Sequence, residues 1–384
     1  MYGFDIYFIV LSHDAHFFFA ALPRDTTDVR LNLQDTDYAG ILDDEAQLTT
    51  GAFKEKATLK FATEFKYMRS QANEPLATFL DYISYEYMIN NIILILETML
   101  QNPDSDTEIV MSRCHPLGQM SERTIKLIAS FKNSKRMIDE LVQNVLVNTP
   151  VGKYFEQYLS SLTENERLRG GAEVQGILSE KNYNVIEHHV MRLYLEDFYR
   201  FVQTLGGETA EIMGNLLKVR ADQRSINIVR NSFSWELGTE RAKRESDRQA
   251  LLPSFGMIYP QGTALMKDVK KESDLTTFLK KYKAYSRLWE VWADLENKDD
   301  DSGGLDDGWY HFMLELYETA FLGQCNYAPF YAFVKLKEQE VRNLVYICEC
   351  IQQRQKDKIG LYIPIFSPSR GLMAWSKMET KHRA

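Results

Sequence analysis

Apolar and polar residues follow the period of an α-helix along most of the chain. In residues 331–351 the apolar residues recur at spacings of three, four and seven, and these residues are Val334, Val341, Leu344, Val345, Cys348 and Ile351. The opposite face is polar and holds Glu338, Glu340, Arg342 and Asn343. The pattern therefore predicts a surface helix with one buried stripe.

The same period predicts helices elsewhere, and period-two alternation, which would indicate strands, is scarce. The predicted helices are residues 53–68, 75–100, 121–146, 183–205, 209–233, 275–293, 308–322 and 330–358. Gly, Pro, Asn and Asp clusters separate them, as at the ends of helices in general. The chain is therefore predicted to be all-α.

Size and charge narrow the class of protein. A chain of 384 residues is long for one hydrophobic core, because single cores stop growing at ~250–300 residues. The formal net charge of −9 disfavours nucleic acid and anionic lipid as partners, since both recruit basic patches. Four cysteines in so long a chain, without an N-x-[ST] acceptor, favour a reducing, cytosolic setting. No run approaches the ~18–20 apolar residues of a spanning helix.

Cysteines and histidines are the candidates for a reactive or metal site. Cys114 and His115 lie in "RCHPLG", but no second cysteine or histidine pair lies near enough to complete four metal ligands. We interpret them as a core cysteine and a turn residue. His188 and His189 are adjacent in a predicted helix and point about 100° apart, so we interpret them as surface histidines.

The predicted helix at residues 331–351 also contains a cysteine pair and a glutamate pair. Cys348 and Cys350 lie on different faces, and only Cys348 joins the apolar stripe. Glu338 and Glu340 are two positions apart and do not face each other, so we expect solvated charges. Phosphate-binding and hydrolase motifs are absent from the sequence. The sequence therefore predicts no catalytic, cofactor-binding or metal-binding residue.

A short polar pattern recurs in four predicted helices. It consists of an acidic residue five positions before an asparagine, and it occurs at Glu86 with Asn91, Asp139 with Asn144, Asp222 with Asn227 and Glu338 with Asn343. Two copies add a glutamine four positions before the asparagine, Gln223 and Gln339. Such pairs stabilise a helix locally by roughly 0.2–0.5 kcal/mol, which explains them better than a shared binding role.

Several stretches, in order along the chain, resemble one known family. They are "LQDTDYAGIL" from Leu33, "EFKYMRSQANEPLATFLDYISYEYMINNIILIL" from Glu64, "CHPLG" from Cys114, "VRADQRSINI" from Val219, and "FYAFVKLKEQEVRNLVYICECIQQR" from Phe330 with "YIPIF" after it. Together they resemble subunit d of the vacuolar-type proton ATPases. The likeness covers residues 28–366 and is strongest in the last stretch.

The resemblance implies an all-α fold of three similar small helical-bundle domains in a pseudo-threefold cone or funnel. It implies a non-catalytic subunit that links the central stalk to the membrane proteolipid ring and couples ATP hydrolysis to proton transport. The implied partners are the proteolipid c-ring, the central-stalk subunits and the membrane a subunit. The implied location is the cytoplasmic face of vacuolar, lysosomal or endosomal membranes, reached through protein contacts only.

Two segments depart from the family pattern. Residues 1–27 do not resemble the helical segment with which the family begins, and they lack the basic start of a signal peptide. Residues 367–384 follow "YIPIF" and are expected to form a flexible tail, whereas "YIPIF" itself is expected to dock on the body. The alternatives are a helical scaffold of another cytosolic assembly and, in a third class, an all-helical carboxylate or histidine enzyme.

Overall fold

The computed structural model is helical throughout the residues that it describes. Those residues are 33, 36–40, 49–101, 107–118, 120–121, 124, 126–127, 146–161, 180–232, 248–266, 269, 272–286, 288–289, 305–355, 358 and 365. Every regular element in this part of the chain is an α-helix or a 3-10 helix, and none is a strand. The prediction of an all-α chain is confirmed.

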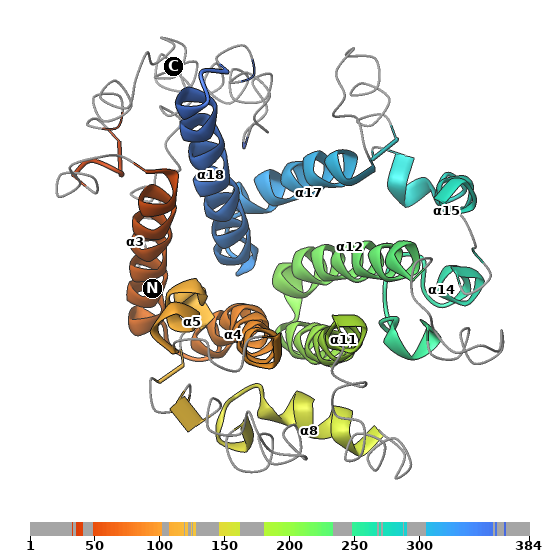
Figure 1. The fold of residues 1–384 in the computed structure, drawn as a ribbon. Coiled ribbons are helices and arrows are strands. Elements are labelled where there is room, and N and C mark those ends of the chain that lie inside the picture. The colour runs from red at the N-terminus through yellow and green to blue at the C-terminus, as the bar shows by residue number, and fades with distance from the viewer. Residues whose placement is uncertain are drawn as a thin grey trace, which may run out of the picture. The chain divides into compact units, whose positions relative to one another are not determined.

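The chain divides into two compact units. Unit 1 contains the N-terminal part up to Gln71, Asp306–Gln324 and the part from Ala328 onward. Its helices are α3 (Thr50–Gln71), α17 (Leu305–Phe321) and α18 (Ala328–Gln352). The first residue of α17, Leu305, is counted with unit 2. Figure 1 shows α3 and α18 side by side, although most of the chain lies between them in sequence.

Unit 2 comprises Ala72–Leu305 and Cys325–Tyr327. Three long helices form its centre: α4 (Leu76–Gln101), α11 (Glu180–Leu205) and α12 (Gly207–Asn231). In Figure 1, α11 runs beside α12 and also beside α4. Its shorter elements are α5 (Thr107–Arg113), η2 (Pro116–Gly118), η3 (Leu146–Asn148), α8 (Gly152–Ser161), α14 (Gln261–Met266), α15 (Glu272–Leu279) and η4 (Lys283–Tyr285).

Most predicted helices agree with the structure to within three residues, and two do not. The predicted helix 330–358 ends at Gln352, because Arg354 has a positive φ of 58° and the chain turns back there, with Gln355 donating its N–H to the carbonyl of Cys350. The predicted helix 275–293 begins earlier, at Glu272, and breaks after Leu279. Most of the predicted helix 121–146 lies outside the described residues.

A glycine pair separates the two central helices of unit 2. Gly206 and Gly207 have φ angles of 67° and 54°, a left-handed conformation that side chains with a Cβ adopt at a cost. The chain therefore reverses direction between α11 and α12 without a longer loop. This allows α12 to pack against α11.

The prediction of a surface helix at residues 331–351 is wrong. Several polar side chains of α18 are as buried as its apolar stripe, and they are Lys335, Lys337, Gln339, Glu340 and Asn343. The apolar residues of α18 meanwhile join Tyr38, Phe53 and Ala57 in one core cluster. The helix is therefore a central element of unit 1 and not an outer one.

Aromatic side chains fill the contact between α4 and α11 in unit 2. The ring of Tyr82 is stacked on Phe198 and Phe201, with centroids 5.2 and 4.8 Å away. Phe79 packs against Phe198 at 5.7 Å. Aromatic pairs of this kind add to the stabilisation that burial alone provides.

The chain ends are described only in part. Ile365, within "YIPIF", is buried, as expected for a docked segment. Its neighbours in that segment, together with residues 1–27 and 367–384, lie outside the described residues. Within the described helices, none has an apolar stretch long enough to cross a membrane.

Two substitutions on α3 test this packing. Phe61 is 2% exposed and meets the ring of Phe333 edge-on, so Phe61→Ala should lower the free energy of unfolding by about 3–5 kcal/mol. Leu59 lies two positions away and is 55% exposed, so Leu59→Ala should change it by no more than about 0.5 kcal/mol. Urea unfolding followed by circular dichroism measures both. Equal effects would contradict the burial of Phe61.

Candidate functional site

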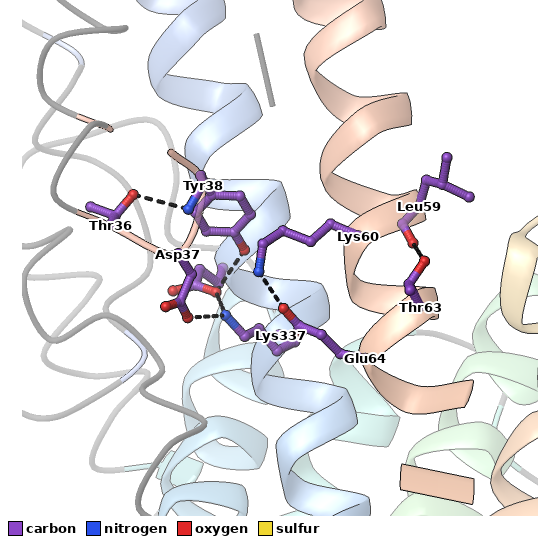
Figure 2. Close-up of polar contacts among 9 residues, drawn as sticks. Thr36, Asp37, Tyr38, Leu59, Lys60, Thr63, Glu64 and Lys337 are labelled. Carbon is purple, nitrogen blue, oxygen red and sulfur yellow. Dashed lines mark hydrogen bonds and ion pairs between the residues drawn. The ribbon is translucent and has the colours of Figure 1, made fainter. Parts of the chain in front are cut away.

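A cluster of charged side chains is buried in unit 1, where α18 meets the segment 36–40. Lys337 is 1% exposed and Glu340 is 2% exposed, and the Lys337 ammonium donates to the Glu340 carboxylate over 2.7 Å. The Tyr38 hydroxyl donates to the same carboxylate oxygen, also over 2.7 Å. The Asp37 carboxylate lies 3.5 Å from the Lys337 ammonium (Figure 2). One helix thus holds two consecutive residues from near the other end of the chain.

The ring of Tyr38 faces two lysines. The ammonium of Lys337 lies 5.2 Å from the ring centroid, and the ammonium of Lys60, from α3, lies 5.7 Å from it. Lys60 also pairs with Glu64 one turn along α3, as Figure 2 shows. The segment itself is folded locally by Thr36, whose hydroxyl accepts the N–H of Tyr38.

The surroundings keep Tyr38 and Lys337 each in one protonation state. Burial raises the pKa of Tyr38 well above its ordinary value, and the negative charge of Glu340 raises it further. Burial alone would lower the pKa of Lys337, but the charge and hydrogen bond of Glu340, together with the charges of Glu64 and Asp37, outweigh burial, and the pKa is raised. The tyrosine therefore stays neutral and the lysine charged at physiological pH. Neither group is prepared to exchange a proton with a substrate.

In unit 2, Asn91 of α4 holds the turn that contains "CHPLG". Its side-chain oxygen accepts the N–H of His115 over 2.8 Å, and its amide nitrogen donates to the carbonyls of His115 and Gly118, each over 2.9 Å. A Cβ at Gly118 would collide with the backbone of Tyr87, so only glycine fits there. His115 lies in a turn, as we interpreted it, whereas Cys114 is only half-buried and is not the core cysteine that we expected.

Asp222 of α12 holds a second turn in the same way. One oxygen of its carboxylate, Oδ2, accepts the N–H groups of Met257 and Ile258, over 2.8 and 3.1 Å, and the hydroxyl of Tyr285. A Cβ at Gly256 would collide with this carboxylate. In the sequence, Asp222 is distinguished only as part of the acid-and-asparagine pattern, which gives no indication of these partners.

Asp197 of α11 joins three helices. Its Oδ2 accepts the hydroxyl of Tyr82 from α4 and, from α8, the Tyr154 hydroxyl and the Lys153 ammonium, over 3.1, 2.8 and 2.6 Å. Its Oδ1 accepts from Arg200 over 3.2 Å. No motif in the sequence indicated this residue, because its partners come from segments 43 and 115 positions away.

The two histidines are not surface residues, contrary to our interpretation. His188 and His189 are both buried, and burial lowers the pKa of each to about 4, with help from Arg224 for His188 and Arg192 for His189. Both are therefore neutral at physiological pH. The His189 ring meets Tyr158 of α8 edge-on, so it contributes to the packing of α8 on α11.

The pairs on α18 also differ from the prediction. Cys348 and Cys350 are both buried and both belong to the core cluster, although only Cys348 was expected there. Burial raises the pKa of the Cys348 thiol to about 12, so it is not a nucleophile at neutral pH. Glu338 is partly exposed and pairs with Lys335, whereas Glu340 is buried and not solvated.

One signal in the sequence could have revealed the buried pair. Lys337 lies three positions after Val334 and four before Val341, so it occupies a place in the apolar stripe itself. Glu340 lies three positions after it, within reach for an ion pair. A charged residue inside an apolar stripe, with an opposite charge one turn away, is typical of a buried ion pair.

The acid-and-asparagine pattern does not give one common contact. Gln339 donates to Asn343 over 2.8 Å, which confirms that local pair, whereas the side-chain oxygen of Gln223 accepts from Arg220. Glu86 accepts from Arg220 over 2.7 Å. In the described part of the chain, no three His, Cys, Asp or Glu side chains come together as metal ligands. The arrangement as a whole positions backbone turns and helices.

Comparison with known proteins decides the family. The family model described as ATP synthase (C/AC39) subunit matches residues 21–362, which include all the buried polar contacts described above. The chain belongs to this family. Its relatives carry the name subunit d of the V-type proton ATPase, a non-catalytic subunit of that complex.

Three relatives show how much of the chain the likeness covers. The V-type proton ATPase subunit d of Dictyostelium discoideum is 36% identical over 341 residues, which cover 88% of this chain and 86% of the relative. Subunit d1 of Arabidopsis thaliana is 35% identical over 333 residues, 86% of each chain. Subunit d of Saccharomyces cerevisiae is 32% identical over 343 residues, 88% of each. The resemblance seen in the sequence is thereby confirmed.

Removing one member of the buried ion pair should destabilise the protein strongly. Lys337→Met leaves the Glu340 carboxylate buried without its cation, and we expect a loss of about 3–5 kcal/mol in the free energy of unfolding. Lys60→Met is the matched control, because both Lys60 and Glu64 are 28% exposed, and we expect a loss below about 1 kcal/mol. Urea unfolding of both variants measures the difference.

A second substitution shows whether the unpaired charge of Glu340 causes the loss of stability. Glu340→Gln, added to Lys337→Met, replaces the isolated carboxylate by a neutral amide and should restore part of the lost stability. A double variant less stable than Lys337→Met alone would mean that the carboxylate is not the source of the loss.

Proposed function

We propose that this chain is the subunit of a V-type proton ATPase that links the central stalk to the proteolipid ring in the membrane, and so couples ATP hydrolysis to proton transport. The observation that carries the proposal is the extent of the likeness. Seven relatives named subunit d of this ATPase are 30–36% identical over 83–88% of the chain. A partial or single-domain match would not support a role for the whole chain.

The internal construction of each unit suits a part that transmits force. Helices α4 and α11 have 26 residues each, which corresponds to about 39 Å of regular helix. In unit 2, Asn91 and Asp222 hold the intervening turns through buried hydrogen bonds. In unit 1, Glu340 holds Tyr38 in the same manner. A coupling element between two rotating parts needs such stiffness, since a compliant one would store torque as local deformation.

The finer features of the proposal rest on the resemblance. They are three similar helical subdomains arranged as a pseudo-threefold cone, contacts with the c-ring, the central stalk and the membrane a subunit, and a place on the cytoplasmic face of vacuolar, lysosomal or endosomal membranes. Contacts of a permanent assembly typically bury on the order of 2,000 Å² or more. Mild salt should therefore release little of the protein from the ring, because such contacts depend more on apolar burial than on screened charge.

Depletion in the native cells tests the coupling role. Vesicles isolated from depleted cells should show no ATP-driven acidification, although the proteolipid ring remains in the membrane, because the stalk would have no seat on the ring. Acidification measured with a pH-sensitive dye and ring content measured by immunoblot give the two readouts. Re-expression of the chain should restore acidification. Normal acidification in vesicles that lack the chain and any paralogue would refute the proposal.

Affinity purification after gentle detergent treatment separates this function from the alternative of a general helical scaffold. Ring and stalk subunits should co-purify with the tagged chain. Recovery of an unrelated assembly without either would favour the scaffold.

A further inference from the structure

Asp222 is a buried carboxylate that has only neutral partners. It is 1% exposed, and its Oδ2 accepts from two backbone N–H groups and from the Tyr285 hydroxyl. Its Oδ1 is also buried and has no hydrogen-bond partner. An ionised carboxylate without a cation is costly in such a place, because the neutral donors only partly replace its hydration. The same three donors, however, favour the ionised form.

The titratable groups around Asp222 come from three directions. The chain around η4 contributes Tyr285 and Tyr282, both uncharged at neutral pH. From α11, the Glu196 side chain accepts the N–H of Ser254, two positions before Gly256. On α12 itself, Arg220 and Arg224 are paired with Glu86 and Glu187. Within the described residues, therefore, no ion pair of Asp222 with a cation is formed.

We propose that Asp222 is a proton-operated latch, which holds the turn of residues 256–258 on α12 more firmly when it is protonated. When the turn opens, water reaches the carboxylate, and its proton affinity returns to that of an ordinary aspartate. The closed turn binds a proton more tightly than the open turn, so a fall in pH favours closure.

The size of the effect follows from the two proton affinities. Burial raises the pKa of Asp222 to about 6 in the closed form, although the donors from Tyr285, Ile258 and Met257 oppose the rise, whereas the ordinary value is 3.8. The closed turn is fully stabilised at a pH below the ordinary pKa, and this stabilisation is lost as the pH rises through the pKa of the closed form. Opening should therefore be about tenfold rarer at pH 5 than at pH 7.5.

The latch controls an exposed part of the surface. Met257 lies in this turn and Tyr259 directly follows it, and both are among the exposed large apolar side chains of the described residues. Protonation of Asp222 would therefore determine how rigidly these two side chains are held. The inference concerns unit 2 by itself and does not depend on the proposed function.

Hydrogen exchange of the full-length protein tests the latch. The amide hydrogens of Met257 and Ile258, which donate to Asp222, are followed by mass spectrometry at pH 5 and pH 7.5, with correction for intrinsic exchange. Protection should be about tenfold higher at pH 5. Equal protection at the two pH values would overturn the proposal.

Two variants assign the effect to Asp222. Asp222→Asn keeps an acceptor oxygen but cannot titrate, so the protection of these amides should no longer change with pH. Tyr285→Phe removes a donor that favours the ionised form, so the midpoint of the pH dependence should move upward from its wild-type position near pH 6.

With two variants, the proposal can still be tested if Asp222→Asn fails to fold. If Asp222→Asn does not fold by circular dichroism, the direction of the shift in Tyr285→Phe decides. An unchanged or lowered midpoint there, or an unchanged pH dependence in a folded Asp222→Asn, would show that another group carries the proton.

Discussion

The turns between helices set the main constraint on this fold. A helix satisfies its own backbone hydrogen bonds, but a buried turn cannot, and an unpaired buried N–H or C=O costs free energy comparable to a lost hydrogen bond. In unit 2 the long helices supply the missing partners from their side chains. Asn91 binds one N–H and two carbonyls, and Asp222 binds two N–H groups. These residues must be polar and must also be buried, which explains why polar positions interrupt the apolar faces of α4 and α12.

In unit 1 the same constraint is satisfied by charged side chains, which join the segment 36–40 to α18. Tyr38 and Glu340 are 302 positions apart, and the Tyr38 hydroxyl donates to the Glu340 carboxylate. Lys337 donates to the same carboxylate and balances its charge. This contact explains why α18 carries so many charged residues and is nevertheless a central helix. Burying an ion pair does not by itself add much stability, since desolvation offsets the attraction. Its effect is specificity, because an unpaired charge would strongly disfavour any other register of α18 on the segment 36–40.

The sequence allowed the helices to be predicted much better than the site. Helical period and Gly or Pro breaks are local properties, so the bounds of α4, α11 and α12 were nearly correct. The same rule assigned Glu340, His188 and His189 to the surface, because period alone treats every polar residue as solvated. Tyr38, which contacts Glu340, and Arg224 and Tyr158, which lie beside His188 and His189, come from other elements, and no spacing within one helix could reveal these contacts. Lys337 is the exception, since its place inside the apolar stripe was a local signal.

Two aspartates of unit 2, the partly buried Asp197 and the buried Asp222, show how neighbouring groups determine the pKa of a carboxylate. Burial would raise the pKa of Asp197 as it does that of Asp222, but Lys153, together with the Tyr154 and Tyr82 hydroxyls, outweighs it, and the pKa of Asp197 is lowered. The donors to Asp222 are all uncharged, so burial prevails there. The contact between α4, α8 and α11 is therefore insensitive to pH near neutrality, whereas the turn on α12 is not. A rigid contact among helices and a titratable contact at a turn thus coexist within one unit, and the difference lies in the cations, Lys153 and Arg200, that pair with Asp197.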